Sequence, residues 1–170
     1  MKRRLLTIVG ILAGLAVTGM LVAASIWPVI NVVETGETPE YPDVQPQYYT
    51  AEPRRVFEES RDSIEAMERW TVVSSQPAND TLKATHSTYV FGFVDDVTVW
   101  IEPVTEFVTR VRLRSASRIG KGDFGQNARN IQQFFGALDE RLGAVKFDPE
   151  QLDAPPDQPD ADPSEADAGN

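Results

Sequence analysis

The sequence contains no cysteine and a single histidine, His86, among its 170 residues. The absence of cysteine excludes a disulfide framework, a thiol nucleophile and a cysteine-built zinc site. One histidine is too few for the usual transition-metal site, so we expect no metal and no cofactor. The length allows one modest domain with appendages and excludes a multidomain enzyme.

The formal net charge of −10 arises in two flanking segments rather than in the middle of the chain. Residues 34–53 hold five acidic residues and no basic one, and residues 148–170 hold eight acidic residues and no basic one. Residues 54–147 hold 13 basic and 13 acidic residues and are neutral overall. Because a nucleic-acid-binding domain needs a basic surface, we expect no nucleic-acid partner.

Residues 1–33 predict a membrane anchor. After the basic tip Lys2, Arg3 and Arg4, residues 5–33 carry no charged side chain. Residues 5–26 would form a helix about 33 Å long, which matches a hydrocarbon core of about 30 Å. Basic residues before the span and acidic residues after it predict a single-pass bacterial inner-membrane protein, with a cytoplasmic N-terminus and a periplasmic or otherwise extracytoplasmic domain.

Two further expectations concern the same segment. Small residues around Ala23 would suit a signal peptidase, so a cleaved signal peptide is the alternative to an uncleaved anchor. Gly10 and Gly14 form a GxxxG pattern, which would pair two such helices into a homodimer.

The two acidic segments are expected to have no core of their own. Residues 34–53 combine their acidic residues with four prolines, a composition that predicts a stiff tether. Residues 148–170 contain five prolines and one large aliphatic residue, Leu152, and predict a disordered tail. The folded domain is therefore expected at residues 54–147.

Hydrophobic periodicity predicts the elements of this domain. Phe57, Ile64 and Met67 have helical spacing and indicate an amphipathic helix that ends near residue 69. Alternating or aromatic-rich runs predict four strands, at residues 70–75, 81–88, 97–102 and 107–115.

A second helix is predicted at the end of the domain. Its apolar positions recur at helical spacing, namely Ala128, Ile131, Phe135, Leu138 and Leu142. Asp123 and Gln126 have capping-box spacing, and Gly143 is placed to end the helix. The whole order predicts an α+β class domain, a four-stranded mainly antiparallel sheet packed by two helices.

Two segments carry distinctive motifs. Residues 92–103 contain Gly92-Phe93 and Asp95-Asp96. Residues 114–131 contain Arg114-Ser115, Ser117-Arg118, Gly120, Asp123, Gly125, Asn127-Ala128 and Ile131. On these motifs, residues 56–142 resemble a bacterial and plastid family called domain of unknown function 1499, although Trp100 and Asn130 stand where its pattern has arginine. The resemblance implies a shared fold and a shared surface, and it implies no activity.

The sequence contains residue types that can catalyse hydrolysis, but no motif that arranges them. His86, Asp95, Asp96, Ser115 and Ser117 could supply a hydrolytic constellation, but nothing in the sequence sets their geometry. The strand alternation places His86 on the same side as Leu82 and Ala84, which predicts an inward histidine. Adjacent strand residues point to opposite faces, so Asp95 and Asp96 are not expected to act as a pair.

Positive charge gathers between residues 109 and 129. The candidate anion-binding face consists of Arg110, Arg112, Arg114, Arg118 and Lys121. Alternation places the first three arginines on one sheet face, and Lys121 precedes a predicted helix N-terminus, where anions are favoured. Anionic lipid, a cell-wall polymer or an acidic protein segment would be its partner. The alternative is a solvated ladder in which Asp95, Asp96 and Glu102 pair with these cations.

These observations favour a non-enzymatic binding or interaction domain displayed on a membrane. A small cysteine-free hydrolase that uses His86 with a nearby serine or aspartate is the first alternative. A purely structural subunit of a membrane complex is the second.

Overall fold

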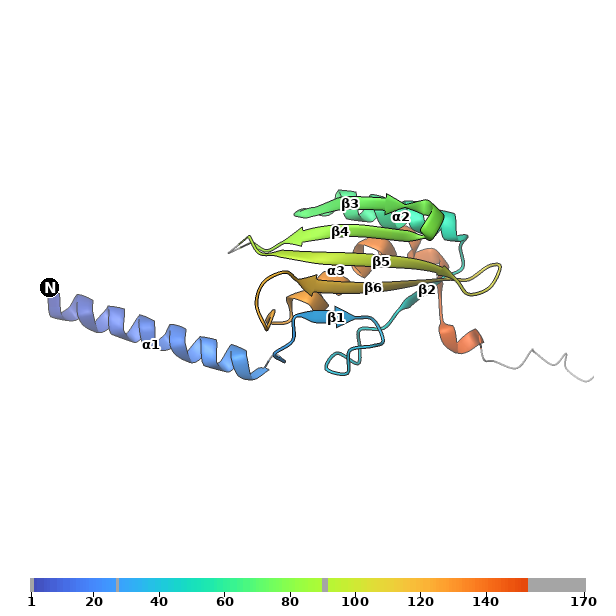
Figure 1. The fold of residues 1–170 in the computed structure, drawn as a ribbon. Helices are drawn as coiled ribbons and strands as arrows, with labels where there is room; N and C mark the ends of the chain where they lie inside the picture. Colours follow the sequence, from blue (N-terminus) through green and yellow to red (C-terminus); the bar gives the residue numbers. More distant parts are fainter. Residues whose placement is uncertain (1, 27, 90–91, 153–170) are drawn as a thin grey trace, which may run out of the picture.

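The computed structural model describes residues 2–26, 28–89 and 92–152, and within them seven strands form one antiparallel sheet (Figure 1). The strand order is β3-β4-β5-β6-β2-β7, and β1 pairs with β6 as well. The helices are α1 (Lys2–Ile26), α2 (Pro53–Ala66) and α3 (Gln126–Leu142). The strands are β1 (Val32–Glu34), β2 (Gln47–Tyr49), β3 (Trp70–Gln76), β4 (Thr81–Ser87), β5 (Val94–Pro103), β6 (Thr109–Ser117) and β7 (Lys146–Phe147). Three short 3₁₀ helices, η1 (Pro77–Asn79), η2 (Gly143–Val145) and η3 (Pro149–Leu152), complete the described elements.

The predicted four-stranded sheet with the order α-β-β-β-β-α is wrong. The two predicted helices of the domain are α2 and α3, and the four predicted strands are β3 to β6, but three short strands join the same sheet. The nine-residue strand β6 pairs along one half with β1 and along the other half with β2, and β7 adds to β2. Strands of two or three residues are too short to show an alternating pattern, so periodicity could not predict them.

Residues 34–53, expected as a tether, lie against the domain. Val44 and Tyr49, and Val33 just before the segment, are at most 5% exposed and belong to the hydrophobic core. The Tyr49 hydroxyl bonds the Asp139 carboxylate of α3 at 2.8 Å. The acidic tail was predicted for residues 148–170; residues 149–152 form η3, and residues 153–170 lie outside the described residues.

The predicted transmembrane helix is also wrong. In the described parts of the chain, no helix combines the length and the apolar character that crossing a membrane requires. The predicted inner-membrane localisation and orientation depended on this span and fall with it. Signal cleavage and pairing through Gly10 and Gly14 stay predictions.

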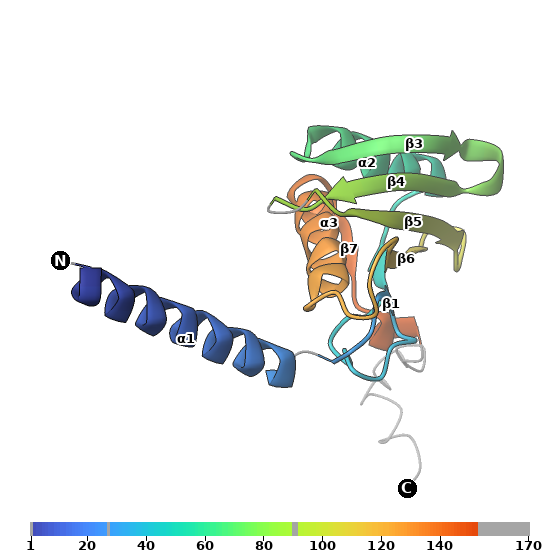
Figure 2. The same cartoon turned by 60° about the vertical axis from the view of Figure 1, so that its left-hand side comes forward.

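Helices α2 and α3 pack on the same face of the sheet (Figure 1 and Figure 2). Alternation decides which strand residues face them: every second residue of β5, from Asp95 to Ile101, is buried. The largest fully buried side chains are Tyr49, Phe134, Ile64, Leu82, Ile101, Leu113, Ile131, Leu138, Leu142, Val33, Val56 and Val97. This helix-facing side is apolar over most of its length and becomes polar at one end, at His86, Asp95 and Ser115.

Candidate functional site

The polar end of the sheet is built by strands in register. His86 of β4 pairs with Asp95 of β5, and Asp95 pairs with Ser117 of β6. Trp70 of β3 is the register partner of His86 on its other side, and their ring centroids lie 5.4 Å apart. Because residues directly opposite in neighbouring strands share a face, the pairing forms a row of Trp70, His86, Asp95 and Ser117 across the sheet.

Asp95 is the centre of this row. Its side chain is 1% exposed, and its two oxygens accept hydrogen bonds from the Ser117 hydroxyl at 2.7 Å and the Asn130 amide at 2.9 Å. Burial by itself raises the pKa of Asp95, but His86, Ser117 and Asn130 stabilise the carboxylate, and the net effect lowers that pKa. Asp95 is therefore a carboxylate that stays ionised inside the domain.

Helix α3 covers this carboxylate with two asparagines. Asn130 donates to Ser115 Oγ at 3.1 Å as well as to Asp95. Asn127 accepts the Ser115 hydroxyl hydrogen bond at 2.6 Å and donates to Ser117 Oγ at 3.1 Å. We call these side chains, together with the neighbouring His86, the buried polar cluster, in which Ser117 is half-buried and the others are buried: His86, Asp95, Ser115, Ser117, Asn127 and Asn130. Its hydrogen bonds tie β5 and β6 to the first two turns of α3, and His86 of β4 lies beside them.

His86 is the member of the cluster with an unsatisfied nitrogen. Its Nδ1 atom has no hydrogen-bond partner among the described residues, and Asp95 Oδ2 lies 3.6 Å from it. The His86 side chain is only 9% exposed. His86 also lines a pocket.

This pocket has a volume of about 570 Å³. We call it the His86 pocket. Its lining comes from four places: Glu68 and Arg69 before β3, His86 with Thr88, Tyr89 and Phe93 of the β4–β5 hairpin, Asp123 and Phe124 of the β6–α3 loop, and Gln126, Arg129 and Gln133 of α3. Exposed aromatic rings surround a base formed by His86. The volume falls within the roughly 300 to 1,000 Å³ of small-molecule sites.

Two residues that line the His86 pocket have left-handed backbone conformations. Arg69 has φ 69° and Phe124 has φ 51°. Such conformations cost about 1 to 2 kcal/mol for residues that carry a Cβ atom, and bulky residues adopt them infrequently. Arg69 is held by bonds to the carbonyls of Ser87 and Thr88 and stacks on Tyr89, with Cζ 4.1 Å from the ring centre.

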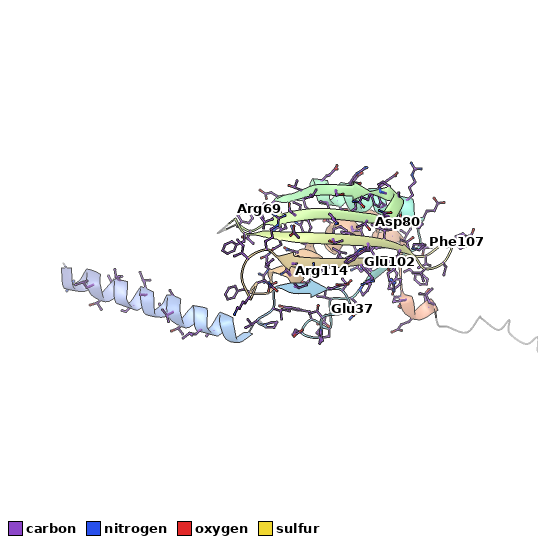
Figure 3. The ribbon with its side chains drawn as sticks, viewed as in Figure 1. Glu37, Arg69, Asp80, Glu102, Phe107 and Arg114 are labelled. Carbon is purple, nitrogen blue, oxygen red and sulfur yellow. The ribbon has the colours of Figure 1, made fainter. Side chains whose placement is uncertain are left out.

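Arg129 holds the opposite wall of the His86 pocket, as Arg69 holds the first. It donates to the Phe124 carbonyl at 3.0 Å and to Gln126 Oε1 at 3.1 Å. Thus each arginine fixes one wall of the pocket through a neutral oxygen atom. Figure 3 places Arg69 at one end of the sheet and Phe107 at the opposite end.

A second pocket, of about 560 Å³, lies between the start of α2 and the β3–β4 turn. Its cations already have carboxylate partners, because Arg54 pairs with Glu58 and Arg61 pairs with Asp62. Its lining contains none of the buried polar cluster. The chemistry of the domain is therefore concentrated at the His86 pocket.

The arginines of the predicted anion-binding face lie on the sheet face opposite the helices. Most of them pair with carboxylates of this protein. Arg110 pairs with Glu102 at 2.6 Å, and Arg112 pairs with Glu34 at 2.6 Å. Arg112 also lies over the Trp100 ring.

Arg118 continues this pairing, because it makes a two-pronged contact with Asp96 at 2.7 and 3.0 Å. Over the described residues, Arg114 and Lys121 have no carboxylate within 4.0 Å. Anion binding by this face stays a prediction.

Asp123 caps α3, but not as the predicted capping box. Its carboxylate accepts the backbone N–H groups of Gly125 and Asn127 at 2.9 and 2.7 Å, and the helix begins at Gln126. The Gln126 side chain donates forward to Asn130 instead of back to Asp123. The predicted helix end at Gly143 is confirmed.

Among the described residues, no hydrogen bond joins a serine hydroxyl to the His86 ring. Ser115 bonds Asn127, and Ser117 bonds Asp95, so the carboxylate lies between the histidine and the serine. In a serine hydrolase the histidine must lie between them to accept the serine proton. In the described parts of the chain, no three histidine, aspartate or glutamate side chains come together to hold a metal ion.

Sequence reasoning missed Arg69, Trp70, Asn130 and the aromatic walls of the pocket. Asn130 had a usable signal, since it lies three residues after Asn127 on the side of α3 that enters the core. Arg69 had none, because its conformation and partners depend on the β4–β5 hairpin.

Comparisons with solved structures give only distant similarities. The chain is 15% identical, with a TM-score of 0.42, to the di-domain ARO/CYC BexL from the BE-7585A biosynthetic pathway; the match covers 74% of this chain and 48% of that one. It is 16% identical, with a TM-score of 0.35, to TTHA0849 from Thermus thermophilus, over 66% of this chain and 97% of that one. It is 10% identical, with a TM-score of 0.38, to CV1439 from Chromobacterium violaceum, over 66% and 97%.

The comparison with curated proteins gives no match. A family described as a protein of unknown function, DUF1499, matches residues 24–138. This range includes all six residues of the buried polar cluster and most of the buried hydrophobic core. The resemblance inferred from the Asp95-Asp96 and Ser115 to Asn127 motifs is confirmed, and the chain belongs to the DUF1499 family.

Proposed function

We propose that the domain is a non-enzymatic binding module that holds a small, largely apolar molecule in the His86 pocket. The observation that carries this proposal is the pocket itself, a cavity of about 570 Å³ with aromatic walls and a buried histidine at its base. Pockets that bind small molecules combine apolar walls with a few convergent polar groups, which is the arrangement here.

The solvent exposure of the aromatic residues in the pocket supports the proposal. Phe93, Phe124 and Tyr89 are 45%, 49% and 74% exposed, although large apolar side chains gain free energy by burial. Phe124 is kept in this place in spite of its left-handed backbone. A ligand that covers these rings would gain the apolar contact area that the fold itself leaves in water.

The arrangement favours binding over hydrolysis. Catalysis by a serine needs a serine hydroxyl that donates to His86, and the serine hydroxyls of the cluster, Ser115 and Ser117, bond to Asn127 and Asp95 instead. Asp95 and the asparagines hold the base of the pocket in one geometry. A rigid base of this kind preorganises a binding site, which lowers the entropic cost of holding a ligand.

The proposal is tested with naphthalene-carboxamide, a neutral aromatic probe small enough for the pocket. The probe is titrated into the full chain, and amide NMR spectra record which residues respond. We expect saturable shifts at Thr88, Phe93, Phe124 and Arg129. Phe93→Ala should weaken binding roughly two- to tenfold, because one aromatic contact contributes about 0.5 to 1.5 kcal/mol.

Phe107→Ala is the matched control. Phe107 is 67% exposed and lies in the β5–β6 turn at the opposite end of the sheet, so its removal should leave probe affinity unchanged. Shifts spread over both ends, or equal effects of the two alanine variants, would contradict a site at the His86 pocket.

Anion binding by the basic face is kept as a second proposal. It is supported by Arg114 and Lys121, whose charges have no carboxylate within 4.0 Å in the described residues. Its test is given in the Discussion.

A further inference from the structure

The base of the His86 pocket indicates what kind of ligand it suits, an inference that rests on the proposed function. His86 is nine-tenths buried, its Nδ1 atom lies 3.6 Å from Asp95 Oδ2, and its side chain lines the pocket. A carboxylate beside Nδ1 favours a proton on that atom. The Nε2 atom is then the part of the imidazole that a ligand meets.

Several charged groups surround this imidazole. Asp95 faces it from β5, Glu68 and Arg69 line the pocket before β3, and Asp123 and Arg129 line it from the β6–α3 loop and α3. Tyr89 of the hairpin is the remaining titratable group of the lining.

The acidic groups of the lining already have hydrogen-bond donors. Glu68 accepts from the Tyr89 hydroxyl at 3.1 Å, and Asp123 accepts two backbone N–H groups of α3. The arginines, in contrast, have no carboxylate within 4.0 Å among the described residues and bond only neutral oxygens. Each guanidinium carries five N–H donors, so both keep donors in reserve. The two acids and two arginines of the lining balance in formal charge, but the spare hydrogen-bond donors belong to the arginines, and a carboxylate is the group that accepts from them most strongly.

We propose that the His86 pocket takes an apolar carboxylic acid, whose carboxylate accepts a hydrogen bond from protonated His86. On binding, Nε2 takes one proton from solvent, Nδ1–H continues to face Asp95, and the ligand carboxylate lies against the new Nε2–H. The imidazolium then lies between two carboxylates, the buried Asp95 and that of the ligand. The apolar body of the ligand covers Phe93 and Phe124.

The experiment compares naphthalene-carboxylate with naphthalene-carboxamide, which differ only in the group offered to His86. Calorimetry at about pH 8, in two buffers of different ionisation enthalpy, counts the protons taken up on binding. We expect uptake approaching one proton for the carboxylate and none for the amide. Carboxylate affinity should weaken up to about tenfold for each unit of rising pH, as expected when one proton is linked to binding.

His86 can be observed directly, because it is the only histidine in the chain. Its imidazole NMR signals should move toward the imidazolium position with the carboxylate and stay in place with the amide. His86→Gln should remove the preference for the carboxylate while amide binding persists. Asp96→Asn, next in sequence but on the opposite sheet face, should change neither. If His86→Gln does not fold, the proton count and the histidine spectrum of the unmodified chain decide alone.

The outcomes separate this inference from the proposed function. Equal affinity for both probes without proton uptake would overturn the carboxylic-acid inference and leave the binding pocket standing. Carboxylate shifts centred on Arg114 and Lys121 would overturn it as well. If neither probe shifts the residues of the pocket, both proposals fall.

Discussion

Replacing Asp95 by asparagine should destabilise the domain, because Asp95 is the acceptor on which the buried polar cluster depends. Ser117 and Asn130 each donate to one of its oxygens. A hydrogen bond to a charged group contributes roughly 1.5 to 3 kcal/mol. Asparagine keeps one acceptor oxygen and replaces the other with an NH₂ group, so one donor loses its acceptor and the second bonds a neutral oxygen. We expect a loss of about 2 to 4 kcal/mol from a total of about 5 to 15 kcal/mol.

The measurement is the free energy of unfolding in urea, followed by circular dichroism of the full chain. Asp96→Asn is the control, because Asp96 lies one residue farther along β5 and pairs with Arg118 at the surface, where both side chains are 52% exposed. Such exposed pairs contribute about 0 to 1 kcal/mol. Equal losses in the two variants would refute the argument that the buried carboxylate holds β5 and β6 to α3.

The pH dependence of stability gives an independent check on Asp95. Its pKa is lower in the folded chain than in the unfolded chain, so its contribution is present above the unfolded pKa of about 3.9 and is lost as pH falls through the folded pKa. Between about pH 5 and pH 2 the unmodified domain should therefore lose more stability than Asp95→Asn does. A larger acid loss in the variant would contradict the sign of this pKa change.

Three further changes test other parts of the structure. Phe124→Gly should relieve the left-handed backbone strain at φ 51° and raise the free energy of unfolding in urea by up to about 1 kcal/mol. The same change should weaken naphthalene-carboxamide binding. A lower free energy of unfolding would contradict the argument for strain. Tyr49→Phe should lower the free energy of unfolding by about 1 to 2 kcal/mol, because it removes the hydrogen bond from residues 34–53 to Asp139. An unchanged unfolding midpoint would show that this hydrogen bond does not stabilise the domain. Arg114→Glu should weaken binding to anionic vesicles at low salt if the basic face binds anions, and vesicle cosedimentation equal to that of the parent would leave Arg114 and Lys121 as solvated cations.

Local pattern was sufficient for the long elements and for the direction of several side chains. The helical spacing of Phe57 and Ile64 and the alternation of β4 to β6 appear in the sequence because they depend only on neighbours along the chain. The same alternation correctly placed His86 inside and Asp95 and Asp96 on opposite faces. An uncharged run at residues 5–33 was, however, not sufficient evidence for a membrane span.

Pairing between segments far apart in the sequence determined the features that local pattern did not predict. Strands β1, β2 and β7 have two or three residues each and exist because the edges of β6 and β2 supply hydrogen-bond partners, so their sequences alone carry no strand signal. Register, which the sequence does not state, brought His86, Asp95 and Ser117 into one row and paired the arginines of the outer face with carboxylates. The His86 pocket likewise needs four separate segments to meet. The sequence by itself therefore determined the two domain helices, the four long strands and the inward residue types. The tertiary structure alone determined the three short strands and which residues meet, because contacts across strands and loops depend on distances that local periodicity does not encode.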